Sequence, residues 1–196
     1  MPGPSTTNVL VPGPLVTGGV LVAPTGTALP VDEAAALNAA FTALGFITED
    51  GVENADSIET DVVRAWGGII IATTQSSRTA TFAFTMAEYF NADVNKLVWG
   101  DANVQTVPAT SSSGTKFKVS ASAYARPPFK SFVFEMSGDG SSKSRIVVPR
   151  ARVTDMDNRT FVHTAVTGRG VTLTAFPDAS GNSYYEYGND GITTGS

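Results

Sequence analysis

The sequence predicts a mainly β domain with one or two helices and an extended arm at each end. Most of the 196-residue chain alternates apolar and polar residues with a period of two, the pattern of half-buried strands. Pro and Gly gather in the first 31 residues, and the last nine residues are polar and rich in Gly. No linker interrupts the part between them. We therefore expect an extended N-terminal arm (1–31), one β domain (32–187) and a flexible C-terminal tail (188–196).

The predicted N-terminal arm carries no charged side chain, and its six prolines favour an extended, polyproline-like conformation. It has neither a cationic start nor an unbroken apolar core, so it does not resemble a signal peptide. Its prolines also interrupt each apolar run that could cross a membrane. An uncharged and moderately apolar arm of this kind needs a surface on which to pack.

Two segments, 32–44 and 86–98, carry the signals of helices. The first begins at an aspartate that can cap it, is rich in alanine and ends at Gly45. Both place apolar residues three or four positions apart, as one face of a helix requires. These residues are Leu37, Phe41 and Leu44 in the first segment, and Tyr89 or Phe90, Val94 and Leu97 in the second.

The rest of the chain predicts strands joined by turns. Gly67–Gly68 predicts a hairpin turn between the first two strands, and 138–143 predicts another. We expect the last two strands to pair around 180–182, residues 106–115 to form a flexible surface loop, and Pro149 to lie at an edge or a bulge. The predicted strands are 57–66, 69–75, 79–85, 115–125, 130–137, 144–154, 169–178 and 182–187.

The charges are segregated along the chain. Residues 1–63 contain eight acids and no Lys or Arg, whereas residues 116–152 contain eight bases and two acids. These segments are either solvated faces of one domain, or an acidic segment that meets the basic face of another copy. The net charge of −5 argues against a tightly held nucleic acid.

The sequence offers little for catalysis, so we expect no enzyme, no cofactor and no metal site. There is no Cys, which excludes disulfides and thiolate chemistry, and His163 is the only histidine. In a Thr-rich segment, His163 is expected at a surface or an interface. The carboxylates at 155–158 lack the Gly and the Glu that complete a calcium loop.

Four stretches together resemble the major tail protein, the tail tube subunit, of long-tailed bacteriophages, most closely that of phages of actinobacteria. The resemblance covers about residues 30–187, and the stretches follow the order of that family. They are LNAAFTALGFITEDGVENADSIETDVVRAWGG (37–68), QSSRTATFAFTMAEYFNADVNKLVWGDANV (75–104), SRIVVPRARVTD (144–155) and GVTLTAFPDASGNSYYEY (170–187).

The resemblance implies a β-sandwich or barrel-like tail tube fold with flanking helices, a long loop and terminal arms. It implies a virion protein, assembled in the host cytoplasm, whose hexameric rings stack into the tube through which the genome leaves. Its implied partners are further copies of the chain, a tape-measure protein in the lumen, tail tip and terminator proteins at the ends, and passing DNA, with no membrane. The alternative is a β-sandwich binding or capsid decoration module.

The six carboxylates within 44–68 are then expected on a long hairpin that reaches the next ring. Its acids would meet bases of the neighbouring copy, and Trp66 would be buried at the contact, unless it fills the core of its own subunit. The acidic excess also suits a channel that must not hold DNA. The predicted assembly residues are Glu49, Asp50, Glu59, Asp61, Arg64 and Trp66 on the hairpin, and Lys116, Lys118, Arg150 and Arg152, with Lys130 and Arg145, on the neighbour.

Overall fold

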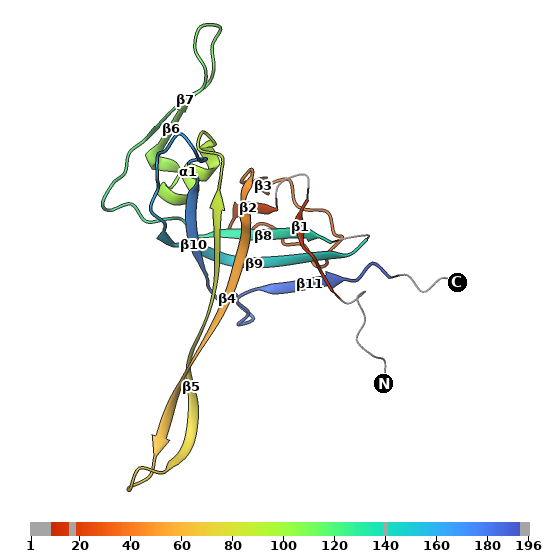
Figure 1. Ribbon diagram of the computed structural model, residues 1–196, viewed down its shortest axis with the longest axis vertical. Helices are drawn as coiled ribbons and strands as arrows, with labels where there is room; N and C mark the ends of the chain where they lie inside the picture. Colours follow the sequence, from red (N-terminus) through yellow and green to blue (C-terminus); the bar gives the residue numbers. More distant parts are fainter. Residues whose placement is uncertain (1–8, 16–18, 139–140, 193–196) are drawn as a thin grey trace.

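A computed structural model describes residues 9–15, 19–138 and 141–192, and antiparallel strands dominate them (Figure 1). The predicted mainly β class is therefore confirmed. In chain order the elements are β1 (Gly13–Pro14), β2 (Val20–Pro24), β3 (Thr42–Ala43), β4 (Ile47–Arg64), β5 (Ile70–Met86), α1 (Ala92–Trp99), a 3-10 turn (Asp101–Asn103), β6 (Val104–Val107), β7 (Lys116–Val119), β8 (Lys130–Ser137), β9 (Lys143–Met156), β10 (Arg169–Ala175) and β11 (Tyr185–Asn189).

One large sheet holds most of the strands in the order β3-β2-β8-β9-β10-β5-β4. In addition, β1 pairs with β8 and β11 pairs with β9, while β6 and β7 form a separate hairpin beside α1. Strands β8, β9 and β11 run across the body, and β4 and β5 run along the longest axis of the molecule (Figure 1).

The large sheet curls back on itself around the main core. The rings of Phe82 on β5 and Phe134 on β8 stack with centroids 4.9 Å apart, although β9 and β10 lie between these strands in the sheet. Phe84 meets Phe134 edge-on at 5.9 Å. Val94 and Leu97 of α1 are buried in the same core. The curled sheet and its helix make the sandwich-like body that the family resemblance implies.

The predicted helix at 32–44 is wrong, because Arg145 occupies the carbonyl groups that such a helix would use. Arg145 Nη1 donates to the backbone oxygens of Asp32 and Ala35, at 2.7 and 2.8 Å. The expected cap at Asp32 does form, since its side chain accepts from the amides of Ala34 and Ala35. The segment then continues without helix, and its Phe41 packs in a second, smaller core on the other face of β2 and β8.

The second predicted helix exists but is shorter than expected. Strand β5 runs on to Met86, and α1 begins only after Asn91, whose side chain accepts from the amide of Asp93 at 2.9 Å. The apolar face predicted for the helix interior is correct for Val94 and Leu97, which are buried. Tyr89 and Phe90 precede the helix and are therefore not part of that face.

Three predicted features of the strands are confirmed. Gly67 and Gly68 form a turn with φ of +102° and +90°, where a side chain would be strained. Strands β8 and β9 pair around the predicted turn, of which residues 139 and 140 lie outside the described part. Pro149 lies in a bulge, because β8 has one residue where β9 has two between Val148 and Ala151.

Other strand predictions are wrong. The last two strands, β10 and β11, do not pair with each other; both pair with β9, at Ala151–Met156 and Lys143–Val147 respectively. Strand 115–125 shrinks to the four residues of β7, and residues 106–107 belong to β6 rather than to the predicted loop.

The two ends of the chain are more integrated than the predicted arm and tail. Strand β2 pairs with β8, and Val20 and Leu21 are buried, so this part of the predicted arm belongs to the body. Strand β11 extends to Asn189, inside the predicted tail. Residues 1–8, 16–18 and 193–196 lie outside the described residues, and the arm and the tail stay a prediction there. Of the helices that the structure describes, none has the length and apolarity to cross a bilayer.

Candidate assembly surfaces

The hairpin of β4 and β5 starts inside the body and extends far beyond it (Figure 1). Every residue from 53 to 64 and from 70 to 79 is exposed, whereas Ala80, Phe82, Phe84 and Met86 further along β5 are buried. We call residues 53–79 the outer hairpin, and the remaining residues of β4 and β5 the inner hairpin. Apart from the contact of Asp56 with Tyr184 at its base, the outer hairpin has no packing partner on either face in the described part of the chain.

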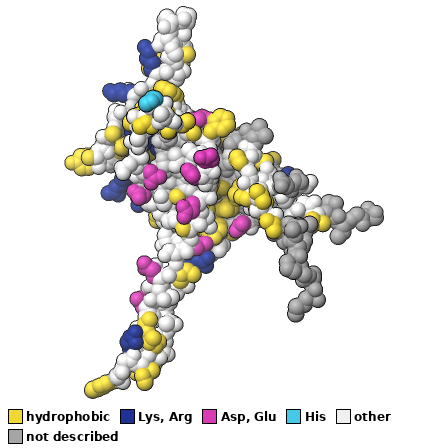
Figure 2. Space-filling view, in the orientation of Figure 1, with side chains coloured by type: hydrophobic (Ala, Val, Ile, Leu, Met, Phe, Trp, Pro, Cys, Tyr) yellow, Lys and Arg dark blue, Asp and Glu magenta, His cyan; other side chains and the backbone are white. Residues whose placement is uncertain are grey.

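The tip of the outer hairpin is apolar. The side chain of Trp66 is fully exposed, and Ile69, Ile70 and Ile71 are each more than half exposed. The turn itself is ordered by hydrogen bonds, since the amide of Gly68 donates to Ala65 O at 2.9 Å and Arg64 Nη1 donates to Gly68 O at 2.9 Å. Trp66 therefore does not fill the core of its own subunit, and that alternative is wrong. Hydrophobic side chains gather at this end in Figure 2.

The two faces of the outer hairpin differ in chemistry. Residues opposite one another on paired strands share a face, so Ile58 and Val62 continue the face on which Phe82 and Phe84 point into the core. The other face of β4 carries carboxylates, and the β5 residues opposite them are small or bear hydroxyl groups. The acids of that face are Glu53, Glu59 and Asp61, opposite Ala83, Ser77 and Thr74.

The acids of the outer hairpin differ in what they bind. Asp56, at the base, lies 3.9 Å from the guanidinium of Arg78 and accepts a hydrogen bond from the Tyr184 hydroxyl at 2.7 Å. This bond is the main cause of the raised pKa of Tyr184. Glu59 accepts a hydrogen bond from the Ser77 hydroxyl, at 2.9 Å. No ion pair between described residues involves Glu59 or Asp61, so their charges are available to another molecule.

Strand β4 is the edge of the large sheet. It is 18 residues long and pairs only with β5 among the described strands. A long edge leaves a row of backbone amides and carbonyls that can pair with another chain. The strand at the other end of the sheet is β3, which has two residues and therefore leaves far fewer backbone groups unpaired.

The predicted basic partners do not form one surface. Lys116 and Lys118 are exposed on β7 beside α1, and Phe117 between them turns to the other side, as the alternation predicts. Arg150 and Arg152 lie elsewhere, over the ring of Phe129, at 4.1 and 5.0 Å from its centroid. Each pair remains accessible to a neighbour.

Two other predicted partners are engaged inside the subunit. Arg145 is buried, is paired with Glu135, and donates to the carbonyls described above, so its assignment to a contact between copies is wrong. Lys130 lies 3.8 Å from the carboxylate of Asp101, and its side chain is only one-fifth exposed. On the hairpin, Glu49 and Asp50 lie in the inner part, away from the tip, and are exposed.

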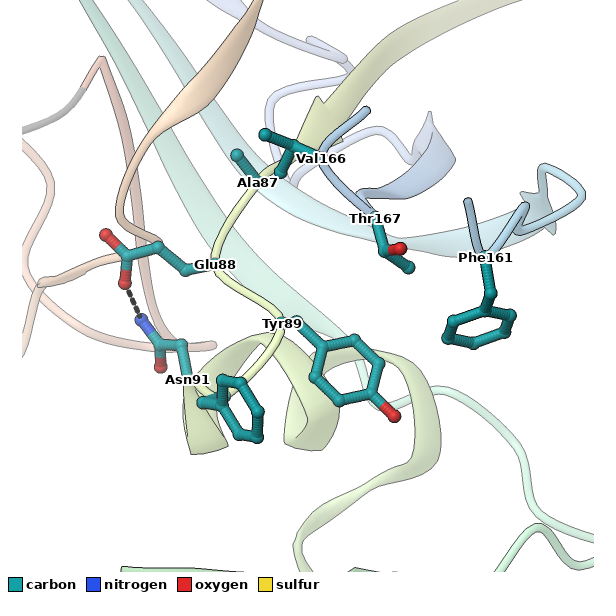
Figure 3. Close-up of a pocket in the computed structure, with 8 residues that line it drawn as sticks. Ala87, Glu88, Tyr89, Asn91, Phe161, Val166 and Thr167 are labelled. Atoms are coloured by element: carbon teal, nitrogen blue, oxygen red, sulfur yellow. Dashed lines mark hydrogen bonds between the residues drawn. The ribbon is translucent and has the colours of Figure 1, made fainter. Parts of the chain in front are cut away.

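The sequence analysis missed an aromatic hollow beside α1 (Figure 3). It is open, has a volume of about 830 Å³, and is lined by residues just after β5 and by the loop between β9 and β10. Phe90, Phe161 and Val166 are 78, 66 and 74% exposed. Its lining residues are Ala87, Glu88, Tyr89, Phe90, Asn91, Phe161, Val166 and Thr167.

A cluster of rings includes three lining residues of this aromatic hollow, Tyr89, Phe90 and Phe161. Tyr89 contacts Phe90, Phe117 and Phe161 edge-on, with centroids 5.1, 5.8 and 6.2 Å apart. The guanidinium of Arg159 lies 5.6 Å from the centroid of Phe161. Treating 86–98 as one helix hid this cluster, because that assignment placed Tyr89 or Phe90 on a buried face.

A curled antiparallel sheet, a long unpaired edge and a projecting hairpin with an apolar tip are features of a structural β protein built for contact with other chains. The family model for phage tail tube proteins matches residues 2–193, and the chain belongs to that family. The structure is similar to the cryo-EM structure of an anti-feeding prophage cap, the cap that terminates its tube. That likeness has a TM-score of 0.44 and 11% identity over 91% of this chain and 94% of the other. No curated protein matches the sequence significantly.

Membership of this family makes the chain a structural protein of a phage tail, located in the virion tail. It favours a role other than catalysis. The family does not specify a host, so the resemblance to tail proteins from phages of actinobacteria stays a prediction.

Proposed function

We propose that copies of this chain assemble into rings that stack into a tail tube, and that the tube conducts the genome out of the virion. The observation that carries the proposal is the outer hairpin, which extends from the body with both faces, its edge and its apolar tip exposed. Membership of the tail tube family supports the same function.

Within a ring, the long edge of β4 would pair with a neighbouring copy. Pairing would satisfy the backbone groups that β4 leaves open, and repetition around the ring would close the sheets into a barrel without edges. We propose hexameric rings, as the resemblance implies. Pairing with a neighbouring copy would also explain why the 18-residue strand β4 lies at the edge of the sheet in a single subunit.

Between rings, the outer hairpin would reach the next copy along the tube. The charges of Glu59 and Asp61 are free of ion pairs in the described structure. Lys116 and Lys118 are exposed on β7, at the end of the molecule opposite the tip (Figure 1). Attraction between these groups would fix the register of stacking more than its strength. Arg150 and Arg152 would contact neighbouring copies at the side of the body.

The finished tube would enclose a channel for DNA and for a tape-measure protein during assembly in the host cytoplasm. Tail tip and terminator proteins would bind its two ends. A net charge of −5 per subunit disfavours the retention of DNA, since like charges repel the phosphates.

Negative-stain electron microscopy of the purified chain, concentrated at low and at high salt, tests the proposal. Hollow tubes of uniform diameter are expected. Isolated particles at all salt concentrations would contradict it and would favour the alternative, a monomeric β-sandwich module that binds or decorates a capsid.

A further inference from the structure

We propose that the aromatic hollow beside α1 is the receptor for the tip of the outer hairpin from the next copy of this chain. The inference rests on the proposed tube and adds the site at which one ring holds the next. The occupant is thus a second copy, and the contacting groups are Trp66 and the isoleucines that follow it.

The hollow has the chemistry to receive such a tip. Phe90, Phe161 and Val166 leave a contiguous apolar surface in water, and exposed apolar patches of this kind mark sites of protein interaction. Its one carboxylate, Glu88, already accepts hydrogen bonds from Asn91 Nδ2 at 3.0 Å (Figure 3) and from the amide of Phe46 at 3.1 Å. An entering indole would therefore meet rings and methyl groups, beside a carboxylate whose two oxygens already accept hydrogen bonds.

The tip and the hollow lie at opposite ends of one strand. Strand β5 starts beside the tip at Ile70 and ends at Met86, and the hollow begins at the next residue, Ala87. Seventeen residues at about 3.3 Å each separate them by roughly 55 Å. The tip therefore cannot enter the hollow of its own copy. A contact between the two unlike surfaces joins copies head to tail and leaves both ends open for growth, which is the geometry of a filament.

Charged groups of opposite sign lie near the two surfaces. Arg159 lies against Phe161 at the hollow, and Lys116 and Lys118 are exposed on the side of β7 opposite Phe117, whose ring contacts Tyr89. The outer hairpin carries Glu59 and Asp61 within a few residues of Trp66, and neither has an ion pair among the described residues. Figure 2 shows basic side chains near the end opposite the tip, and both acidic and basic side chains along the hairpin. An indole beside Arg159 would also gain a cation–π contact.

Cross-linking between introduced cysteines tests the contact, because the chain has no cysteine of its own. The variant carries Ile69→Cys at the tip and Val166→Cys at the hollow, and it is treated with a short bis-maleimide after assembly. The control carries Ile69→Cys with Val31→Cys, which is as exposed as Val166 at 74% but lies away from the hollow. We expect a ladder of covalent dimers, trimers and longer chains from the first variant and only uncoupled chains from the control.

Microscopy of the same samples separates the two proposals. Tubes without a ladder, or with equal ladders from both variants, would overturn the hollow as receptor and leave the tube function standing. If the unmodified chain forms no tubes at any salt concentration, the proposed function itself fails, and the receptor fails with it.

A double-mutant cycle decides the question if the cysteine variant does not assemble. Trp66→Leu and Phe161→Leu are each expected to raise the critical concentration for tube growth about tenfold, as loss of an aromatic contact at an interface does. Because both changes act on one contact, the double variant should lie well below the hundredfold that independent effects would give. Multiplicative effects, or no effect of Phe161→Leu, would contradict the proposal. Tyr124→Leu, an exposed aromatic elsewhere, is the control and should change nothing.

Discussion

The inner and outer halves of the β4–β5 hairpin share one ladder but differ in what covers them. In the inner half, Phe82 and Phe84 pack against Phe134 of the opposing layer, and Phe82 is completely buried. In the outer half, the same face carries Ile58 and Val62, which remain about half exposed. Burial of apolar side chains thus stabilises the first half within the subunit, while the second half exposes comparable surface without that gain.

The comparison indicates that the inner half of this pair of strands stabilises the folded subunit, whereas the outer half is available for assembly. A natural sequence that exposes apolar side chains on a projecting hairpin commonly does so for a partner. We expect changes in the inner half to lower the stability of the subunit, and changes in the outer half to affect only contacts between copies. The following predictions are ordered by their expected effect on the free energy of unfolding of the isolated subunit.

Replacing Phe82 with Ala should lower the free energy of unfolding by about 3–5 kcal/mol, because it removes a buried ring and leaves a cavity. Urea unfolding followed by circular dichroism measures the loss. Ile58→Ala on the same face of the outer half is the matched control, with an expected loss within about 0.5 kcal/mol. Equal losses of unfolding free energy from the two variants would contradict the proposed difference between the inner and outer halves.

Arg145→Ala should cost about 3 kcal/mol, since it leaves Glu135 as an unpaired buried charge and frees the carbonyls of Asp32 and Ala35. The exposed pair between Arg78 and Asp56 in the outer half should matter much less, so Arg78→Ala is expected to cost between 0 and about 1 kcal/mol. Thermal unfolding of both variants checks the contrast. A larger loss for the Arg78 variant would contradict it.

Tyr184→Phe should cost about 1 kcal/mol, because its hydroxyl ties the body to Asp56 at the base of the outer hairpin. The pKa of Tyr184 is raised by this bond, so the folded state favours the protonated hydroxyl. Its contribution to stability is therefore complete below pH 10 and is lost as the pH rises through the raised value. Unfolding measured from pH 8 to 11 should show a steeper alkaline fall for the natural chain than for the variant.

Trp66→Ala should leave the free energy of unfolding within about 0.5 kcal/mol of the natural value, since the indole touches no core. Tube growth should nevertheless be strongly reduced, because the side chain is proposed to be buried between copies. Sedimentation of assembled material and urea unfolding of the monomer measure the two effects separately. A clear fall in monomer stability would show that the tip already packs within the subunit.

Reversing Glu59 and Asp61 to Lys together should have the smallest effect on the subunit, because neither acid has an ion pair among the described residues. We expect the subunit to fold normally while tube growth is hindered, most strongly at low salt where charges are least screened. Lysine at Thr60, which lies between them on the other face, is the control. Normal tubes from the double reversal would remove these acids from the contact between rings.

Local patterns in the sequence predicted much of this hairpin. Alternation identified parts of its strands, although it missed residues 47–56 of β4 and divided β5 into the separate strands 69–75 and 79–85. The pair Gly67–Gly68 identified its turn, because both signals are properties of residues close in the chain. The same alternation correctly separated Lys116 and Lys118 from Phe117. The family resemblance then pointed to the hairpin as an assembly element, which remains a proposal.

Local patterns failed where a distant residue decided the outcome. The stretch 32–44 has good helical signals, but Arg145, more than a hundred positions away, takes its carbonyls. The aromatic hollow joins residues 87–91 to 161–167, and no spacing in the sequence relates these segments. The pairing of β10 and β11 with β9, rather than with each other, is of the same kind.

The sequence by itself determined that this is a β-rich chain with a glycine turn, a segregated pattern of charge and no thiol chemistry, because these follow from composition and from contacts between near neighbours. Only the tertiary structure decided which strand remains an edge, that Trp66 points into solvent rather than into the core, and that the tip and the hollow lie at opposite ends. Whether a side chain is buried and which strands pair depend on segments from all parts of the chain. A side chain becomes core or contact surface according to which distant segments cover it.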